Sequence, residues 1–212
     1  MNFDLRRIAV AAAAVVLLAA TSDQGVRAPI PESTRSREDI GALESAANLI
    51  IRWPEKSRAL AGMLLEKYGV PDEMVASQLS WNRRRPWKKI VVFRDSEEFG
   101  RSDHLLETVA YGKVPIDRWR ELSALGRGAS YDPLTQELSA RTDREESNIL
   151  ALNLADEVIR GRRSASDARD VYDSTINLAL YGKSSPYTSR LLFHPRGSIA
   201  PQYPGIKGED GL

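Results

Sequence analysis

The chain contains no cysteine, and this absence excludes several kinds of chemistry at once. Without cysteine the protein cannot form a disulfide, bind a metal through thiolates, use a cysteine nucleophile or carry a lipid on an N-terminal cysteine. Histidine is also scarce, with two residues among 212. Histidine chemistry can therefore be sought at only two positions, His104 and His194.

The motifs of the common enzyme classes are missing as well. The chain has no phosphate-binding glycine loop, no dinucleotide-binding fingerprint, no HExxH zinc motif and no GxSxG nucleophile motif. These absences argue against the enzymes that such motifs identify. We therefore expect no cofactor and no metal.

A strong net charge is also lacking. The chain has 30 basic and 29 acidic residues, which give a formal charge of +1. Removing residues 1–28 would take away three arginines and two aspartates, and would leave 27 residues of each sign. A neutral chain has no general attraction to a polyanion, so nucleic acid is not an expected partner.

The first 22 residues are arranged like a secretory signal peptide. Arg6 and Arg7 precede thirteen consecutive apolar residues, 8–20, and a polar stretch follows. A membrane-spanning helix needs about twenty apolar residues, so we predict a cleaved signal and no transmembrane span after cleavage. The predicted location is the periplasm or the cell exterior. The alternative is a protein tethered to the inner membrane by an uncleaved N-terminal segment.

The rest of the chain predicts one globular domain between two irregular segments. Its hydrophobic content of 42% is enough for a core. Residues 23–37 are polar with two prolines and predict a flexible leader. Residues 183–212 contain several prolines and glycines and predict an irregular tail. Between them, residues 38–182 predict an α-rich domain of the α+β class, with a mostly helical N-terminal half whose third helix begins at Pro71.

A small antiparallel sheet is expected in the middle of this domain. The β-branched run at residues 90–93 predicts a strand, whereas residues 105–111 fit either a strand or a short helix. Residues 129–132 and 137–141 lie on either side of an Asp-Pro turn signal. They predict a hairpin that leads into the next helices.

Residues 142–182 predict a central antiparallel helical hairpin. Thr142 and Glu145 have the spacing of a capping box, so we expect the first helix to begin at Thr142. Ser164 predicts the cap of a second helix after a very short link, and the apolar face of that helix runs through residues 168–180. Two helices joined by so short a link should pack antiparallel.

Two asparagines of the first hairpin helix have different expected positions. Asn148 falls on the apolar side, where a buried amide must find hydrogen-bond partners. We expect it to bond the backbone of a neighbouring loop, or alternatively to line a pocket. Asn153 falls on the polar side, which we expect to be solvated.

Residues 81–89 have the most unusual local composition in the chain. The candidate binding residues are Trp81, Arg83, Arg84, Arg85, Trp87, Lys88 and Lys89. Five positive charges with two indoles fit a surface for anionic lipid head groups or envelope polymers. The alternative is that the charges only flank a strand, with both indoles packed inward and the charges partly neutralised by Asp95, Glu97 and Glu98.

Asp103, His104 and Glu107 form the only cluster that resembles a catalytic site. Histidine can transfer protons near neutral pH, and a carboxylate can fix its tautomer. Adjacent residues cannot converge on one point without partners from elsewhere in the chain, however, and the spacing is not that of a metal site. The alternative is a surface loop with a locally bonded histidine. His194 lies in the predicted tail, and we expect it to be structural.

These observations predict an exported protein of the bacterial envelope with a non-enzymatic binding or structural role. Residues 81–89 are the expected contact surface, and a protein partner is a further option. The alternative is an envelope hydrolase that uses His104 with the nearby carboxylates.

Overall fold

The computed structural model describes residues 32–96 and 104–195, without side-chain detail for residues 32–36. The predicted signal peptide therefore lies outside the described residues. The helices are α1 (Glu32–Ile50), α2 (Glu55–Tyr68), the 3-10 helix η2 (Ile116–Arg118), α3 (Trp119–Leu125), α4 (Glu145–Ile159), α5 (Ala165–Leu180) and α6 (Pro186–Ser189). The strands are β1 (Glu73–Val75), β2 (Gln78–Asn82), β3 (Lys89–Phe93), β4 (Leu106–Tyr111), β5 (Ala129–Asp132) and β6 (Glu137–Thr142).

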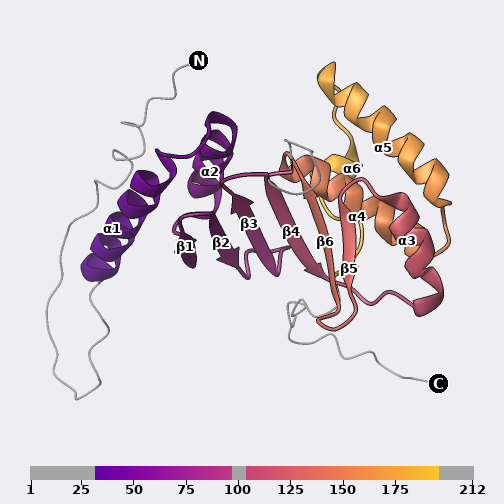
Figure 1. Cartoon of the computed structure of the whole chain (residues 1–212), viewed down its shortest axis with the longest axis horizontal. Helices are drawn as coiled ribbons and strands as arrows, with labels where there is room; N and C mark the ends of the chain where they lie inside the picture. Colours follow the sequence, from indigo (N-terminus) through magenta and orange to yellow (C-terminus); the bar gives the residue numbers. More distant parts are fainter. Residues whose placement is uncertain (1–31, 97–103, 196–212) are drawn as a thin grey trace, which may run out of the picture.

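The six strands form one antiparallel sheet in the order β1-β2-β3-β4-β6-β5. Helices and an antiparallel sheet in one chain confirm the α+β class. Helix α1 lies beside the β1 end of the molecule, and α3 and α5 lie at the other end (Figure 1). Helix α1 begins at Glu32, inside the range 23–37 for which the sequence predicts a leader.

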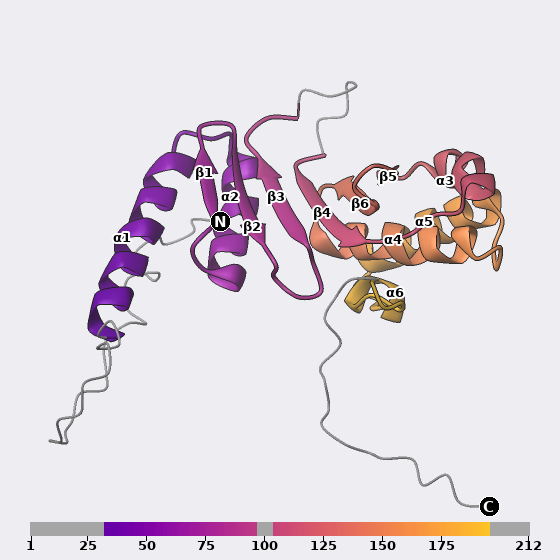
Figure 2. The same ribbon diagram turned by 90° about the horizontal axis from the view of Figure 1, so that it is seen from below.

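One face of the sheet is apolar and carries the core. Trp81, Ile90, Thr108, Ala140 and Ala129 are paired in turn across neighbouring strands, so their side chains share this face. The first four of them are fully buried. Helix α2 contacts β3 here, and α4 contacts β4, β5 and β6. In Figure 2, α4 runs along one side of β5 and β6.

The opposite face of the sheet is largely polar. Here the guanidinium carbon of Arg141 lies 3.8 Å from the centre of the Phe93 ring, and the ammonium of Lys89 lies 3.8 Å from a carboxylate oxygen of Glu73. Apolar residues on one face and polar residues on the other are the usual pattern of an antiparallel sheet with one solvated side. The polar side places charged residues where a ligand can reach them.

The predicted third helix from Pro71 is wrong, because the structure has β1 and β2 there. In β2, Leu79 and Trp81 face the core while Ser80 faces the other side, which is the two-residue period of a strand. Pairing with β3 decides in favour of this period. Residues 106–111 form β4, and the predicted hairpin is confirmed as β5 and β6.

The capping box predicted at Thr142 is also wrong. Thr142 belongs to β6, and its hydroxyl donates a hydrogen bond to the Asn148 side-chain oxygen at 2.7 Å. Helix α4 begins at Glu145 instead, after Arg144. The cap predicted at Ser164 is confirmed, since its hydroxyl accepts from the amide of Asp167 at 3.1 Å.

Both asparagines of α4 are buried. Asn148 donates to the carbonyl of Leu106 at 3.0 Å, so it bonds a strand of the sheet rather than a loop. Asn153 is 2% exposed, and the prediction of a solvated position for it is wrong. Chain from beyond α5 covers it and supplies its hydrogen-bond partners, the carbonyls of Tyr187 and Arg190. Helix α4 therefore has buried residues on every side along most of its length.

Within residues 32–96 and 104–195, no helix combines the length and apolar character needed to cross a bilayer.

Candidate functional site

The basic segment, residues 81–89, contains the end of β2, the connection at residues 83–88 and the start of β3. We call this connection the basic loop. The amide of Arg83 donates to the carbonyl of Lys88 at 2.8 Å, and the amide of Trp87 donates to the carbonyl of Arg84 at 2.7 Å. These two bonds close the connection into a compact loop. The backbone of the loop is therefore held in one conformation, which reduces the cost of ordering it when a ligand binds.

The two indoles of the segment point inward. Trp81 is fully buried and Trp87 is 2% exposed. Their ring nitrogens donate to the carbonyl of Gly69 at 3.0 Å and to a carboxylate oxygen of Glu145 at 2.9 Å. Buried and bonded in this way, neither ring can lie against a membrane or a polymer, so their assignment as contact residues is wrong. They anchor the loop to the core instead.

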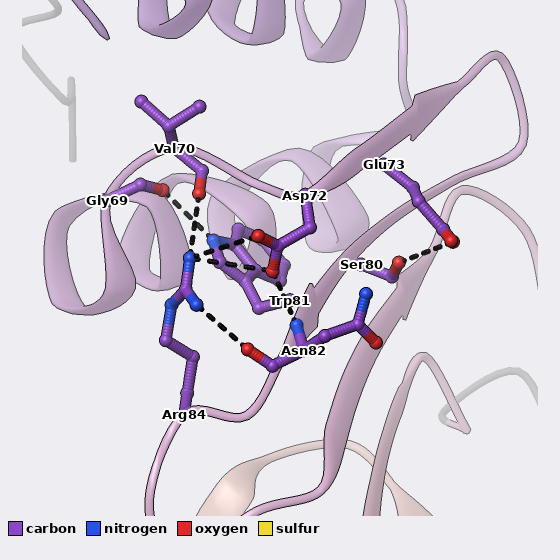
Figure 3. A network of polar contacts seen from close by, with 8 residues as sticks. All are labelled: Gly69, Val70, Asp72, Glu73, Ser80, Trp81, Asn82 and Arg84. Carbon is purple, nitrogen blue, oxygen red and sulfur yellow. Dashed lines mark hydrogen bonds and ion pairs between the residues drawn. The ribbon is translucent and has the colours of Figure 1, made fainter. Parts of the chain in front are cut away.

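Arg84 is also used to hold the loop in place. Its guanidinium donates to the carbonyl of Asn82 at 2.8 Å and reaches the carbonyl of Val70 at 3.4 Å. It also lies 3.5 Å from the carboxylate of Asp72, which in turn accepts from the amide of Asn82 at 2.6 Å (Figure 3). This network ties the loop to the turn after α2.

The two lysines are paired with acids from other strands. The ammonium of Lys88 donates to Glu137 of β6 and lies 4.5 Å from the centre of the Tyr111 ring. The hydrogen bond to Glu137 raises the pKa of Lys88 and so favours its charged form. Lys89 lies 3.8 Å from Glu73.

Three acids that the sequence did not indicate pair with the segment. Asp72, Glu73 and Glu137 pair with it, whereas Asp95 lies beside Arg94 at 3.3 Å. Glu97 and Glu98 lie outside the described residues.

Arg83 differs from the other basic residues of the loop. It is exposed, and no carboxylate within the described ranges forms an ion pair with it. Its backbone has φ = 54°, a left-handed conformation that residues other than glycine seldom adopt. Such strained positions occur often at functional sites.

Arg83 lines a cavity of about 540 Å³. We call this cavity the basic groove, and its charged lining residues are Asp72, Arg83, Arg84, Lys88, Lys89 and Glu137. Four positive and two negative side chains leave an excess of two positive charges. Arg85 is exposed nearby but does not line the groove. The groove has the size of a small-molecule site and the charge to hold an anion.

The predicted catalytic cluster has less support. Asp103 lies outside the described residues, and His104 lies two residues before the start of β4 at Leu106. The backbone carbonyl of His104 accepts from the guanidinium of Arg141 at 3.0 Å, and Glu107 lies directly opposite Arg141 in the sheet. Among the described residues, no group of three or more histidines and carboxylates could hold a metal ion. The hydrolase alternative stays a prediction.

Comparison with protein-family models, with curated proteins and with solved structures found no match to this chain. The function therefore has to be argued from the side chains and cavities of the structure itself.

Several residues of the basic groove could not be found from the sequence. Asp72 lies before β1, and Tyr111 and Glu137 lie in β4 and β6, so none of the three belongs to the basic loop itself. Tyr111 and Glu137 are paired across β4 and β6, so only the strand order and register bring them to Lys88. No local pattern in the sequence indicates that pairing.

Proposed function

We propose that this chain is an exported, non-enzymatic binding module of the bacterial envelope that holds anionic groups of envelope components in the basic groove. The observation that carries the proposal is Arg83, which is exposed, backbone-strained and without a described carboxylate partner beside three further basic side chains. An arginine in this setting can donate two parallel hydrogen bonds to a phosphate or carboxylate.

The rigid surroundings of Arg83 support the same proposal. Trp81 and Trp87 fix the two ends of the loop, and Arg84 fastens its middle to Asp72. An anion would meet a preorganised site and would lose little affinity to ordering of the loop.

Two broader parts of the proposal come from the sequence. The arrangement of residues 1–22 supports export by a cleaved signal, followed by a leader up to residue 37, the domain 38–182 and a tail. The contacts between α4 and α5 support the antiparallel hairpin as the scaffold of the domain. Fractionation of bacterial cells that express the full chain tests the export step, and a full-length protein in the cytoplasm would contradict it.

The test of the groove is the substitution Arg83→Asn, because asparagine tolerates the left-handed backbone better than most residues. We expect binding to phosphatidylglycerol vesicles or to purified anionic envelope polymer to weaken about tenfold, with a shallower salt dependence. The matched control is Arg120→Asn, at an exposed arginine of α3. This substitution removes one positive charge away from the groove and should leave binding unchanged.

Two results would contradict the proposal. If the wild-type protein binds neither probe at low salt, contact with anionic envelope components is wrong. If Arg83→Asn binds as tightly as Arg120→Asn, the groove is not the contact surface. Comparing vesicles with soluble polymer distinguishes a lipid head group from a polymer as the source of the anion.

A further inference from the structure

A second cavity lies at the end of β4, and none of its described lining residues belongs to the basic loop. It has a volume of about 460 Å³ and is formed by the chain after β4, the last turn of α4 and the chain after α6. We call it the C-terminal cavity. Its size falls in the range of small-molecule sites, about 300–1,000 Å³.

The walls of the C-terminal cavity are mainly apolar. Val114 and Leu138 line it and are almost fully buried, and Ile159 and Phe193 add half-buried side chains. An apolar wall of this kind favours the transfer of hydrocarbon from water, at about 25 cal/mol for each Å² that is covered. The cavity is therefore suited to the apolar part of a ligand.

Two basic side chains and one acid line the described part of this cavity. Lys113 and Arg160 are exposed, and the acid among the described lining residues is Asp156. Asp156 is already held by the side chain of Arg160, whose Nε lies 2.9 and 2.7 Å from the two carboxylate oxygens. No carboxylate within the described part of the chain pairs with Lys113. Lys113 is thus available for an anionic group.

The wall after α6 is fixed by one buried side chain. Asn153 donates to the carbonyls of Tyr187 and Arg190 at 2.9 and 2.8 Å, and its oxygen accepts from the amide of Leu192 at 2.7 Å. The next two residues, Phe193 and His194, enter the cavity. Asn153 is therefore a positioning residue for this wall, because its three hydrogen bonds hold the chain after α6 against α4.

The geometry points to a binding site for a single-chain amphiphile with one anionic head group, such as a medium-chain fatty carboxylate. The hydrocarbon chain lies against Val114, Ile159 and Phe193, and the head group meets Lys113 at the rim. The residues that carry this proposal, Lys113, Val114, Ile159 and Phe193, do not line the basic groove, which shares only Tyr111 with the described lining of this cavity and has no comparable apolar wall. It therefore does not rest on the function proposed for that groove.

Titration calorimetry with decanoate and octanoate, below their micelle concentrations, tests the inference. We expect one site per chain and about tenfold tighter binding of decanoate, because two further methylenes are buried. Decyltrimethylammonium has the same chain length and the opposite charge, and it should bind at least tenfold more weakly than decanoate. Equal binding of the cation, or many sites per chain, would show nonspecific adsorption and overturn the assignment.

Two substitutions locate the site. Lys113→Gln changes an exposed side chain, and we expect decanoate binding to weaken about tenfold without a change in thermal stability. Phe193→Ala should reduce the preference for decanoate over octanoate. The control is Lys183→Gln, at an exposed lysine just beyond α5. If Lys113→Gln binds decanoate like the control variant, the C-terminal cavity is not the site.

Discussion

At the scale of single residues, Glu145 joins three parts of the chain. Its carboxylate accepts hydrogen bonds from Trp87 at 2.9 Å, from Tyr68 at 2.7 Å and from Lys67 at 2.7 Å. It lies in the first turn of α4, where the helix dipole favours a negative charge. One acid thus fastens α2 and the basic loop to the start of α4.

Replacing Glu145 should therefore destabilise the fold. We expect Glu145→Ala to lower the free energy of unfolding by about 2–4 kcal/mol, because it leaves the buried indole of Trp87 and the Tyr68 hydroxyl without an acceptor. Urea unfolding measures the change. The neighbouring Glu146→Ala is the control, since Glu146 is exposed and its removal should stay within about 0.5 kcal/mol. Similar midpoints for the two variants would refute this role.

The same contact predicts a dependence of stability on pH. Burial and the hydrogen bond to Glu145 raise the pKa of Tyr68 to about 12, above the value of 10.0 for a free tyrosine. The folded state therefore prefers the neutral phenol, so this contribution is complete below pH 10 and is lost as the pH rises from 10 towards 12. Tyr68→Phe should flatten that part of the curve of unfolding free energy against pH. Parallel curves for variant and wild type would contradict the assignment.

The sequence could identify the basic loop but not the roles of its residues. Five positive charges and two tryptophans are visible in the sequence. The residue type alone, however, does not show whether a tryptophan lies at a membrane surface or in the protein core. What decides between them is the partner, and Gly69 and Glu145 are 12 and 58 residues away. Long-range contacts of this kind have no local signature.

At the scale of secondary structure, the described chain after α5, up to residue 195, includes a helix that its composition does not suggest. Its prolines and glycines predict an irregular tail, but residues 186–189 form α6, which contacts α4. Ser185 caps the short helix by accepting from the amide of Tyr187 at 3.2 Å. The side chain of Tyr187 donates to Glu157 of α4, so this segment is tied to α4 by side chains as well as backbone.

Asn153 should control whether this segment stays on α4. We expect Asn153→Ala to destabilise the protein by about 2–3 kcal/mol and to speed tryptic cleavage after Arg190, because three hydrogen bonds are lost together. Mass spectrometry of timed digests gives the cleavage site and rate. Asn177→Ala, on the exposed side of α5, is the control. Equal cleavage rates would show that Asn153 does not hold the segment.

The predictions for secondary structure succeeded where one period was clear. The β-branched run at residues 90–93 identified a strand, and the Asp-Pro turn signal between residues 129–132 and 137–141 identified the hairpin. The region after Pro71 failed because its apolar residues fit a helix and a strand equally well, and pairing with β3 decides between them. In α5, Leu178 and Leu180 lie on the predicted apolar face but are 54% and 72% exposed, because the described chain covers mainly the other end of this helix.

At the scale of the whole molecule, the sequence patterns predicted the fold class but not the arrangement of the strands in the sheet. The α+β class follows from patterns along the chain, whereas both cavities depend on how the sheet is ordered. The expected export rests on residues 1–22, which lie outside the described residues, and it stays a prediction. No sequence pattern marks the last residue of β4 as one that lines both cavities.

Tyr111, the last residue of β4, lines both the basic groove and the C-terminal cavity. Its ring lies 4.5 Å from the ammonium of Lys88 on the groove side, a cation-π contact that is worth about 0.5–1 kcal/mol at an exposed position. Tyr111→Leu keeps a smaller, apolar side chain and removes the aromatic ring together with its hydroxyl. We therefore expect it to weaken both vesicle binding and decanoate binding, by up to about fivefold each.

The two local variants should behave differently from Tyr111→Leu. Arg83→Asn should affect only the anion bound in the basic groove, and Lys113→Gln only decanoate, because each residue lines one cavity. The comparison is made by measuring the affinity of all three variants for vesicles and for decanoate. Each variant should first be shown to have the thermal stability of the wild-type protein. If Arg83→Asn changes decanoate binding as much as vesicle binding, the two cavities do not act as separate sites, and the anionic head group of the amphiphile must instead be held in the basic groove.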